Sequence, residues 1–170
     1  MKKITLVTGG QRSGKSRHAQ ELALSLSPHP IYLATSAVWD EEHRLRIERH
    51  KADRGSEWTN LEELKDLQLV NVAGRVVVID CVTLWSTNFF TDFDGDTLQS
   101  FAALTSSFDQ FIQQEAHFIF VTNEIGLGGI SANDLQRRFT DLIGWVNQHI
   151  AAKADEVILM VSGIAMKVKG

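Results

Sequence analysis

A glycine-rich turn near the start of the chain places the strongest limit on its fold. Residues 9–16 read Gly-Gly-Gln-Arg-Ser-Gly-Lys-Ser and directly follow the apolar run 4–8. This order matches the P-loop pattern, in which glycines let successive backbone N–H groups point at phosphate oxygens. Lys15 would contact the β- and γ-phosphates, and the Ser16 hydroxyl would ligate Mg²⁺. With residues 17–26 forming a helix that faces the same anion, the motif predicts a nucleoside triphosphate site rather than a chance turn.

Apolar, β-branched runs alternate with helical patterns along the rest of the chain. Most of the apolar runs are nearly continuous, as in strands that are buried on both faces. Such alternation predicts right-handed βαβ crossovers and an α/β fold, a single domain over residues 1–170 with a mainly parallel central sheet flanked by helices. Residues 53–74 are the least regular part. The expected strands are residues 3–8, 30–35, 75–80, 117–122 and 156–161, with a short one near 165–169, and the expected helices are residues 15–26, 39–52, 97–114 and 133–152.

Charge and cysteine content exclude several classes of protein. The chain has 17 Lys and Arg residues against 21 Asp and Glu residues, a formal net charge of −4. Nucleic-acid-binding proteins usually carry a basic excess, so we expect no nucleic-acid partner. The single cysteine, Cys81, allows no disulfide within the chain and favours a reducing compartment. No apolar run reaches the length of a membrane span, and the first run reads as a strand rather than a signal peptide, so we expect a cytoplasmic protein.

Two of the expected strands end in polar side chains. Asp80 follows the apolar run 76–79, at a place where P-loop proteins often hold Mg²⁺ or its water with an acidic residue. The alternative is a carboxylate that caps the next turn, and the P-loop favours the metal role. Asn123 and Glu124 follow the run 118–122 and precede a glycine-rich loop. They could contact a second substrate or simply turn the chain, and the residues alone do not separate these roles.

The highly charged segment 41–51 has helical spacing. On such a helix His43, His50 and Arg54 share one face. A neutral imidazole can attack phosphorus, and neighbouring cations would lower its pKa and neutralise an incoming phosphate. The composition of the segment by itself nevertheless favours a solvent-exposed, salt-bridged helix face.

Several segments, read together, carry a family resemblance. They are residues 8–19, 32–36, 46–51, 80–85 and 121–128, with 146–148, 154–157 and 161–164 near the end. They resemble the bifunctional cobinamide kinase/cobinamide-phosphate guanylyltransferase family of cobalamin synthesis, in the right order over essentially the whole chain. The stretch 92–116 matches weakly. The resemblance implies a RecA-like P-loop NTPase with two reactions. One is NTP-dependent phosphorylation of adenosylcobinamide, and the other transfers GMP from GTP to adenosylcobinamide phosphate, giving adenosyl-GDP-cobinamide.

The same resemblance implies roles for individual residues. His50, in the order Arg-Ile-Glu-Arg-His-Lys, would carry the guanylyl group as a covalent intermediate. Mg²⁺ would be bound by Ser16 and Asp80, and GTP and ATP are the nucleotides, with the donor for the kinase step left open. Gln11 and Ala165 depart from the family's usual residues without touching the inferred chemistry. The implied nucleotide-binding residues are Gly9, Gly10, Gln11, Arg12, Ser13, Gly14, Lys15, Ser16, Ala34, Thr35, Ser36, Lys51, Ala52, Asp53, Arg54, Glu62 and Asp80.

The resemblance also implies partners, and it leaves two rival functions open. The partners are the corrinoid substrate, GTP and ATP, and further copies of the chain in a homo-oligomer such as a trimer. One rival is a small-molecule P-loop kinase that never bonds a nucleotide covalently. The other is a nucleotide-binding regulatory module, although the chain lacks the Asn-Lys-x-Asp element with which signalling GTPases read guanine.

Overall fold

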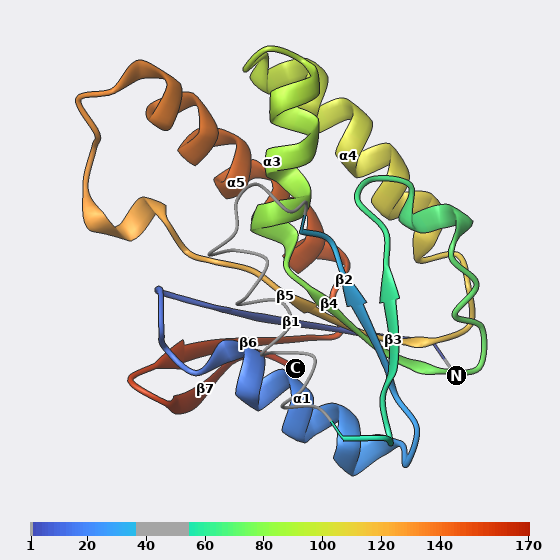
Figure 1. The fold of residues 1–170 in the computed structure, drawn as a ribbon. Coiled ribbons are helices and arrows are strands. Elements are labelled where there is room, and N and C mark those ends of the chain that lie inside the picture. The colour runs from blue at the N-terminus through green and yellow to red at the C-terminus, as the bar shows by residue number, and fades with distance from the viewer. Residues whose placement is uncertain (1, 37–54) are drawn as a thin grey trace.

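The computed structural model describes residues 2–36 and 55–170, in which one seven-stranded sheet carries helices on both faces (Figure 1). The strand order is β3-β2-β4-β5-β1-β6-β7. Every neighbouring pair is parallel except β6 and β7, which form an antiparallel hairpin at one edge. The strands are β1 (Lys3–Gly9), β2 (Ile31–Ala34), β3 (Thr59–Glu62), β4 (Val76–Asp80), β5 (His117–Val121), β6 (Glu156–Val161) and β7 (Ile164–Lys169).

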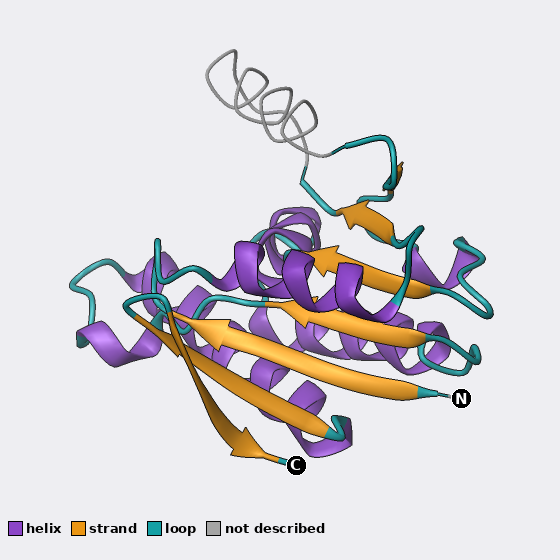
Figure 2. Cartoon of the chain, turned by 90° about the horizontal axis from the view of Figure 1, so that it is seen from below, coloured by secondary structure: helices purple, strands orange, loops and turns teal. Residues whose placement is uncertain are grey.

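The described helices cover the two faces of the sheet unequally. Helix α1 lies on one face, and α3, α4 and α5 lie together on the other (Figures 1 and 2). Two apolar cores follow from this arrangement, a small one under α1 and a large, aromatic-rich one under the three helices. The helices are α1 (Lys15–Leu26), α3 (Val82–Asp92), α4 (Thr97–Phe111) and α5 (Asp134–Lys153), with 3₁₀ turns η1 (Leu67–Leu69) and η2 (Gly126–Gly128).

The central strands are buried on both faces, which explains their continuous apolar sequence. In β4 the side chains of Val77 and Ile79 enter the large core, and that of Val78 between them enters the small core. Side chains of β5 alternate between the two cores in the same way, and those of Phe118 and Phe120 lie in the large core. Burial of consecutive residues is the expected state of an inner parallel strand.

The predicted architecture is confirmed, with two omissions. The mainly parallel sheet with flanking helices, the bounds of α1 and the short final strand agree with the sequence analysis. The interpretation of residues 53–74 as irregular is wrong at residues 59–62, which form the edge strand β3. Helix α3 was not predicted, because its middle is rich in Thr, Ser and Asn, which are weak helix formers. The expected helix 39–52 lies outside the described residues.

One row of paired residues runs across the sheet at the carboxyl ends of its parallel strands. Glu62 pairs with Ala34, Ala34 with Asp80, and Asp80 with Val121. Val121 in turn pairs with Val7, two residues before the P-loop. Ligands of open α/β sheets bind at this edge, so the row positions the candidate site. Within the described part of the chain, no helix is both long and apolar enough to cross a membrane.

Candidate active site

The P-loop adopts a backbone that its glycines make possible. Gly9 ends β1 so close to β6 that a Cβ atom there would lie 2.5 Å from the carbonyl oxygen of Met160 and 2.8 Å from Ser13 Oγ. Gly14 has a φ of 93°, in the left-handed region that favours glycine. Arg12 also has a positive φ, 56°. The backbone N–H of Ser13 donates to the carbonyl of Gly10 at 3.3 Å, which closes the turn.

Helix α1 begins directly after this turn and has no side-chain cap. Its N-cap is Gly14, which lacks a side chain, and its first turn contains no acidic residue. By contrast, Asp96 caps α4 by accepting from Gln99 N, and Asn133 caps α5 by accepting from Gln136 N. The first-turn N–H groups of α1 are therefore available to an external acceptor, and the helix dipole favours an anionic one.

The side chain of Lys15 folds back onto the P-loop, where its ammonium contacts protein atoms. Its ammonium donates to the carbonyl of Gly10 at 2.5 Å and lies 3.5 Å from Ser13 Oγ, and the side chain is buried. Burial lowers the pKa of Lys15, and the negative charge of nearby Asp80 opposes part of that shift. A bound phosphate would supply a stronger, charged acceptor than the Gly10 carbonyl, so we expect the ammonium to move to it.

Asp80 ends β4 next to the P-loop and is oriented by a hydrogen bond. The phenol of Tyr32 donates to Asp80 Oδ2 at 2.8 Å, and the ring of Tyr32 packs edge-on against buried Trp58. The following residue, Cys81, is buried, and burial raises the pKa of its thiol to about 12. Cys81 is therefore neutral at pH 7 and adds no charge at the end of this strand.

The donor set around the P-loop suits Mg²⁺ that arrives with a nucleotide. Ser16 and Asp80 offer a hydroxyl and a carboxylate oxygen, the hard ligands that Mg²⁺ prefers. Mg²⁺ commonly uses one or two carboxylates plus substrate phosphates rather than a cage made only of protein. The described residues contain no group of three or more His, Cys, Asp and Glu side chains that could hold a metal by themselves.

The nucleotide-binding residues expected on β2 and β3 lie along the same edge but are spread out. The Thr35 hydroxyl is fully buried and donates to the carbonyl of Cys81 at 2.8 Å, while it accepts from Cys81 N at 3.0 Å. Thr35 therefore fixes the end of β4. Ala34 and Ser36 flank it and are half-buried. Glu62 is exposed and four strand spacings from β1, about 19 Å at 4.8 Å per spacing.

A polar network behind the P-loop is an addition to the predicted site. Asn123 N and Nδ2 both donate to the Thr83 hydroxyl, at 3.0 and 3.2 Å. The buried Thr122 hydroxyl donates to Asn147 Oδ1 at 2.7 Å, and Asn147 Nδ2 donates to the carbonyl of Asn123 at 3.2 Å. These bonds tie the end of β5 to α3 and α5. Asn123 is therefore fixed in position by its neighbours, and the backbone N–H of Glu124 donates to the carbonyl of Gly9 at 3.0 Å.

The β6–β7 hairpin also contacts the P-loop, and no local sequence pattern predicts this contact. Gly163, in the turn between β6 and β7, donates its N–H to the carbonyl of Ser13 at 3.0 Å. A Cβ atom on Gly14 would lie 3.4 Å from the Gly163 Cα atom. The only sequence signal for this contact was a Ser-Gly pair between two apolar runs, which predicts a hairpin but not what the hairpin touches.

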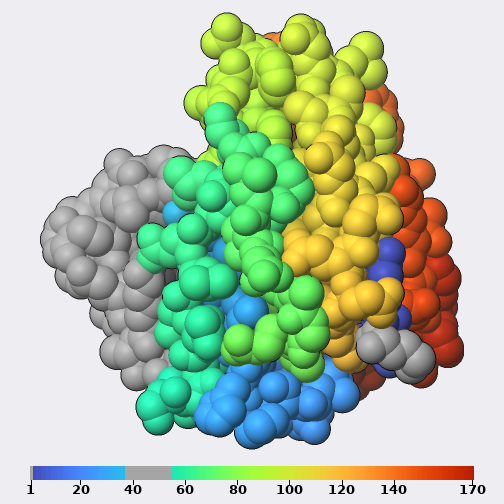
Figure 3. All heavy atoms as spheres, turned by 90° about the vertical axis from the view of Figure 1, so that its right-hand side faces the viewer, coloured from blue at the N-terminus to red at the C-terminus, as the bar shows by residue number. Residues whose placement is uncertain are grey.

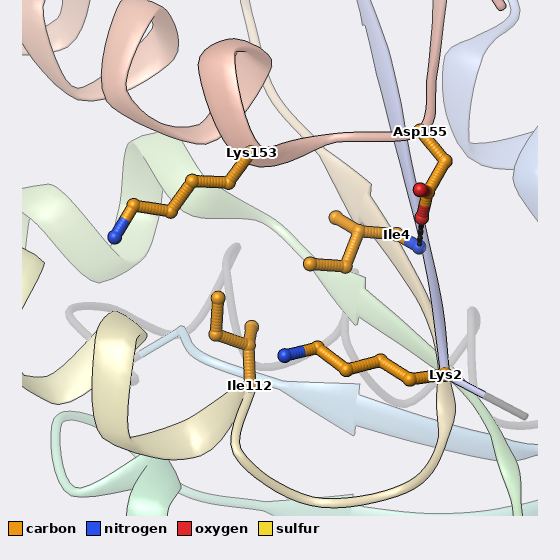
Figure 4. Close-up of a pocket in the computed structure, with 5 residues that line it drawn as sticks. All are labelled: Lys2, Ile4, Ile112, Lys153 and Asp155. Carbon is orange, nitrogen blue, oxygen red and sulfur yellow. Dashed lines mark hydrogen bonds between the residues drawn. The ribbon is translucent and has the colours of Figure 1, made fainter.

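A hollow at the opposite edge of the sheet is not part of this site. It has a volume of about 370 Å³ and lies at the amino ends of β1 and β6 (Figures 3 and 4). Asp155 Oδ2 accepts from Ile4 N at 2.7 Å, and Lys153 pairs with Asp109 at 2.6 Å. Two of the charged residues that line the hollow, Asp155 and Lys153, are thus already paired with other groups of the protein. His50, together with Lys51, Ala52, Asp53 and Arg54, lies outside the described residues.

Comparison with known proteins agrees with this geometry. The sequence model of "Cobinamide kinase / cobinamide phosphate guanyltransferase" matches residues 5–168. The chain is 39% identical over 181 residues to the bifunctional adenosylcobalamin biosynthesis protein CobU of Escherichia coli, covering 98% of this chain and 99% of that protein. It is 37% identical over 169 residues to the bifunctional adenosylcobalamin biosynthesis protein CobP of Pseudomonas aeruginosa, covering 97% and 96%.

Solved structures share the fold at much lower identity. The P4 protein of bacteriophage phi6 in complex with ADP matches with a TM-score of 0.53 and 18% identity, over 96% of this chain and 52% of that chain. An ATPase of a bacterial type III secretion system matches with a TM-score of 0.54 and 9% identity, over 97% and 56%. The chain therefore spans about half the length of these structures. They confirm the predicted fold class of P-loop NTPases.

Proposed function

This chain belongs to the cobinamide kinase / cobinamide phosphate guanyltransferase family, and we propose that it catalyses both reactions of that name. It would phosphorylate cobinamide with a nucleoside triphosphate and then transfer GMP from GTP to cobinamide phosphate. The observation that carries the proposal is the uncapped P-loop helix at the carboxyl edge of the sheet, within a chain that matches the family model over nearly its full length.

In the kinase step, the residues of the P-loop position charge rather than form bonds. The hydroxyl oxygen of cobinamide attacks the γ-phosphorus, the bond between that phosphorus and the bridging oxygen breaks, and the hydroxyl proton leaves to solvent. Lys15 and the free N–H groups of α1 stabilise the charge that develops on the phosphates. Ser16 and Asp80 would hold Mg²⁺, which supplies further charge neutralisation when it is bound.

In the transfer step, we propose His50 as the nucleophile. Its imidazole nitrogen bonds to the α-phosphorus of GTP while pyrophosphate leaves. A phosphate oxygen of cobinamide phosphate then attacks the same phosphorus, the phosphorus–nitrogen bond breaks, and His50 is restored. The support is the sequence around it, where Arg49 and Lys51 adjoin His50 and would neutralise the α-phosphate.

Covalent labelling tests this assignment. The protein is incubated with Mg²⁺ and GTP labelled with ³²P at the α-phosphate, denatured, and examined for label on the chain. We expect acid-labile, base-stable label in the wild type, none in His50→Ala, and wild-type label in His43→Ala, a matched control from the same segment. Absence of label from a wild type that binds GTP would reject the guanylyl-histidine. Parallel assays with ATP and GTP as donors identify the phosphoryl donor.

A further inference from the structure

A second cavity at the carboxyl edge of the sheet lies between the loop that follows β5 and helix α5. Its volume is about 520 Å³. Figure 1 shows this loop swinging outward at the left before the chain enters α5. Small, polar and aromatic residues of both elements line the cavity, among them Gly126, Ile130, Arg137, Gly144, Trp145 and Gln148. Its size is within the range of small-molecule sites.

The cavity begins beside the P-loop. The backbone N–H of Glu124 donates to the carbonyl of Gly9 at 3.0 Å, which fixes the start of the loop to the first glycine of the motif. Gly126 lines the cavity and is two residues further on. Two residues span at most about 7 Å, so the wall of the cavity that Gly126 forms starts close to the end of β1.

The walls of the cavity are held in place by contacts between the loop and the helix. Arg137 Nη1 donates to the carbonyls of Ser131 and Ala132 at 3.0 and 2.9 Å. A Cβ atom on Gly126 would lie 3.6 Å from Thr140 Cγ2, so the start of the loop also lies against α5. A cavity with walls already formed costs less ordering when a ligand binds.

The loop and helix expose apolar side chains around this cavity. Ile130 is 93% exposed, Leu127 on the same loop is 78% exposed, and Trp145 is 41% exposed. Polar groups lie among them, since Asp141, Gln148 and Arg137 also line the cavity. Apolar surface interspersed with a few polar groups is typical of a site for an amphiphilic small molecule.

We propose that this cavity binds the corrinoid acceptor, seating one edge of its macrocycle. The inference rests on the proposed function and names the binding site of its second substrate. The periphery of a corrin ring carries both methyl groups and amide side chains, which suit the exposed apolar residues and the polar lining groups respectively. The seat would place the acceptor beside the nucleotide, which lowers the entropic cost of bringing the two together.

Gly144 offers a way to fill the cavity without disturbing the fold. A Cβ atom on Gly144 meets no other atom within 4 Å, so a larger side chain there would extend into open space. Leucine and alanine are both better helix formers than glycine, so α5 should tolerate either. The variant Gly144→Leu therefore blocks the cavity, while Gly144→Ala adds only one methyl group. Ala152→Leu adds bulk to an exposed position on α5 away from the cavity lining.

Steady-state kinetics of cobinamide phosphorylation and direct cobinamide binding, followed by quenching of tryptophan fluorescence, test the proposal. For Gly144→Leu we expect the KM and Kd for cobinamide to rise about tenfold or more, with the KM for the nucleotide within about twofold of the wild type. Gly144→Ala should show a smaller rise. Ile130→Ser, a change at an exposed side chain, should raise the KM for cobinamide about two- to fivefold. Ala152→Leu should match the wild type.

Two results would overturn the proposal while leaving the proposed function intact. One is an active Gly144→Leu enzyme with unchanged KM and Kd for cobinamide. The other is a change in its mass by light scattering without any change in KM, which would assign the cavity to contact with a second copy of the chain. A wild type that neither binds nor phosphorylates cobinamide would instead reject the proposed function and the acceptor site together.

Discussion

The units β1–P-loop–α1 and β5–loop–α5 have the same order of elements and open on the same edge of the sheet, yet they are built differently. In the first, Gly14 leaves the helix N-terminus without a side-chain cap. In the second, Asn133 fills that place by accepting from Gln136 N at 3.0 Å. The first unit therefore presents free backbone donors, whereas the second presents side chains around a cavity. One edge of a sheet can thus present an uncapped helix N-terminus after one strand and a cavity lined by side chains after its neighbour.

We expect the largest effect from a substitution in the P-loop, which should impair the β1–P-loop–α1 unit alone. Lys15→Met removes the charge that we expect to face the phosphates and should lower kcat/KM for NTP-dependent phosphorylation by about 10²–10³-fold. Cooperative unfolding should persist, because the replacement is apolar, of similar length and buried. Initial rates and a urea melt check both points. Lys65→Met is the matched control, since Lys65 pairs with Asp92 at an exposed position; equal losses in both variants would contradict the P-loop role.

The same glycine-to-alanine change should destabilise the P-loop much more than the loop that follows β5. Gly9→Ala places a Cβ atom 2.5 Å from the carbonyl oxygen of Met160 and should lower the free energy of unfolding by about 2–3 kcal/mol. Gly128→Ala meets no atom within 4 Å and should change it by less than about 0.5 kcal/mol. Urea titrations measure both. Similar costs at the two positions would mean that the loops are equally constrained.

Removal of the cap should affect only the second unit. Asn133→Ala deletes the acceptor for Gln136 N and should lower the free energy of unfolding by about 1 kcal/mol. Asn133→Asp keeps an acceptor at the cap and should stay close to the wild type. Chemical denaturation distinguishes them. If the alanine variant were as stable as the aspartate variant, the cap would not explain how α5 begins.

The smallest effect concerns the far end of α5, where His149 and Lys153 hold Asp109 of α4 at 2.9 and 2.6 Å. Burial pushes the pKa of Asp109 up, but hydrogen bonds from these two partners outweigh it and leave the pKa lowered. The stabilisation is thus present above the ordinary pKa of about 3.9 and is lost as the pH falls through the folded value.

Asp109→Asn should therefore lower the free energy of unfolding at pH 7 by less than about 1 kcal/mol, because the pair is partly exposed. Urea melts at several pH values should show the difference from the wild type shrinking below about pH 4. A difference that stays constant down to pH 2 would show that the charge of Asp109 does not stabilise this contact.

Most of the fold could be predicted because its inner strands are buried on both faces and leave continuous apolar runs. The omissions have physical reasons. In β3 the pattern is mostly exposed, so nothing in Thr59–Glu62 distinguishes a strand from a loop except its pairing with β2. Helix α3 contains weak helix formers, but Val82, Trp85 and Phe89 recur at helical spacing and are buried, so tertiary packing outweighs propensity.

Site residues could be proposed from the sequence where a motif assigns one chemical role to a residue type, as the P-loop does for its lysine and serine. The P-loop and Asp80 lie at one edge of the sheet, as expected from the ends of their strands, and their roles in binding nucleotide and Mg²⁺ stay predictions. Asn123 could not be assigned, because its capture by Thr83 depends on a helix forty residues earlier in the chain. The contact of Gly163 with the P-loop and the cavity beside α5 could not be predicted either, because both form between segments that are far apart in the sequence. Local patterns do not contain that information.

The bond between Gly163 and Ser13 has a consequence for how the protein is made. The phosphate loop is complete in sequence after sixteen residues, yet β1 pairs only with β5 and β6 among the described strands. Both of those strands leave the ribosome late, and Gly163 later still. Such distant pairing is slow to form. A chain that stops before the β6–β7 hairpin would therefore carry an intact motif without the contacts that hold its phosphate loop, and we expect it to bind nucleotide poorly.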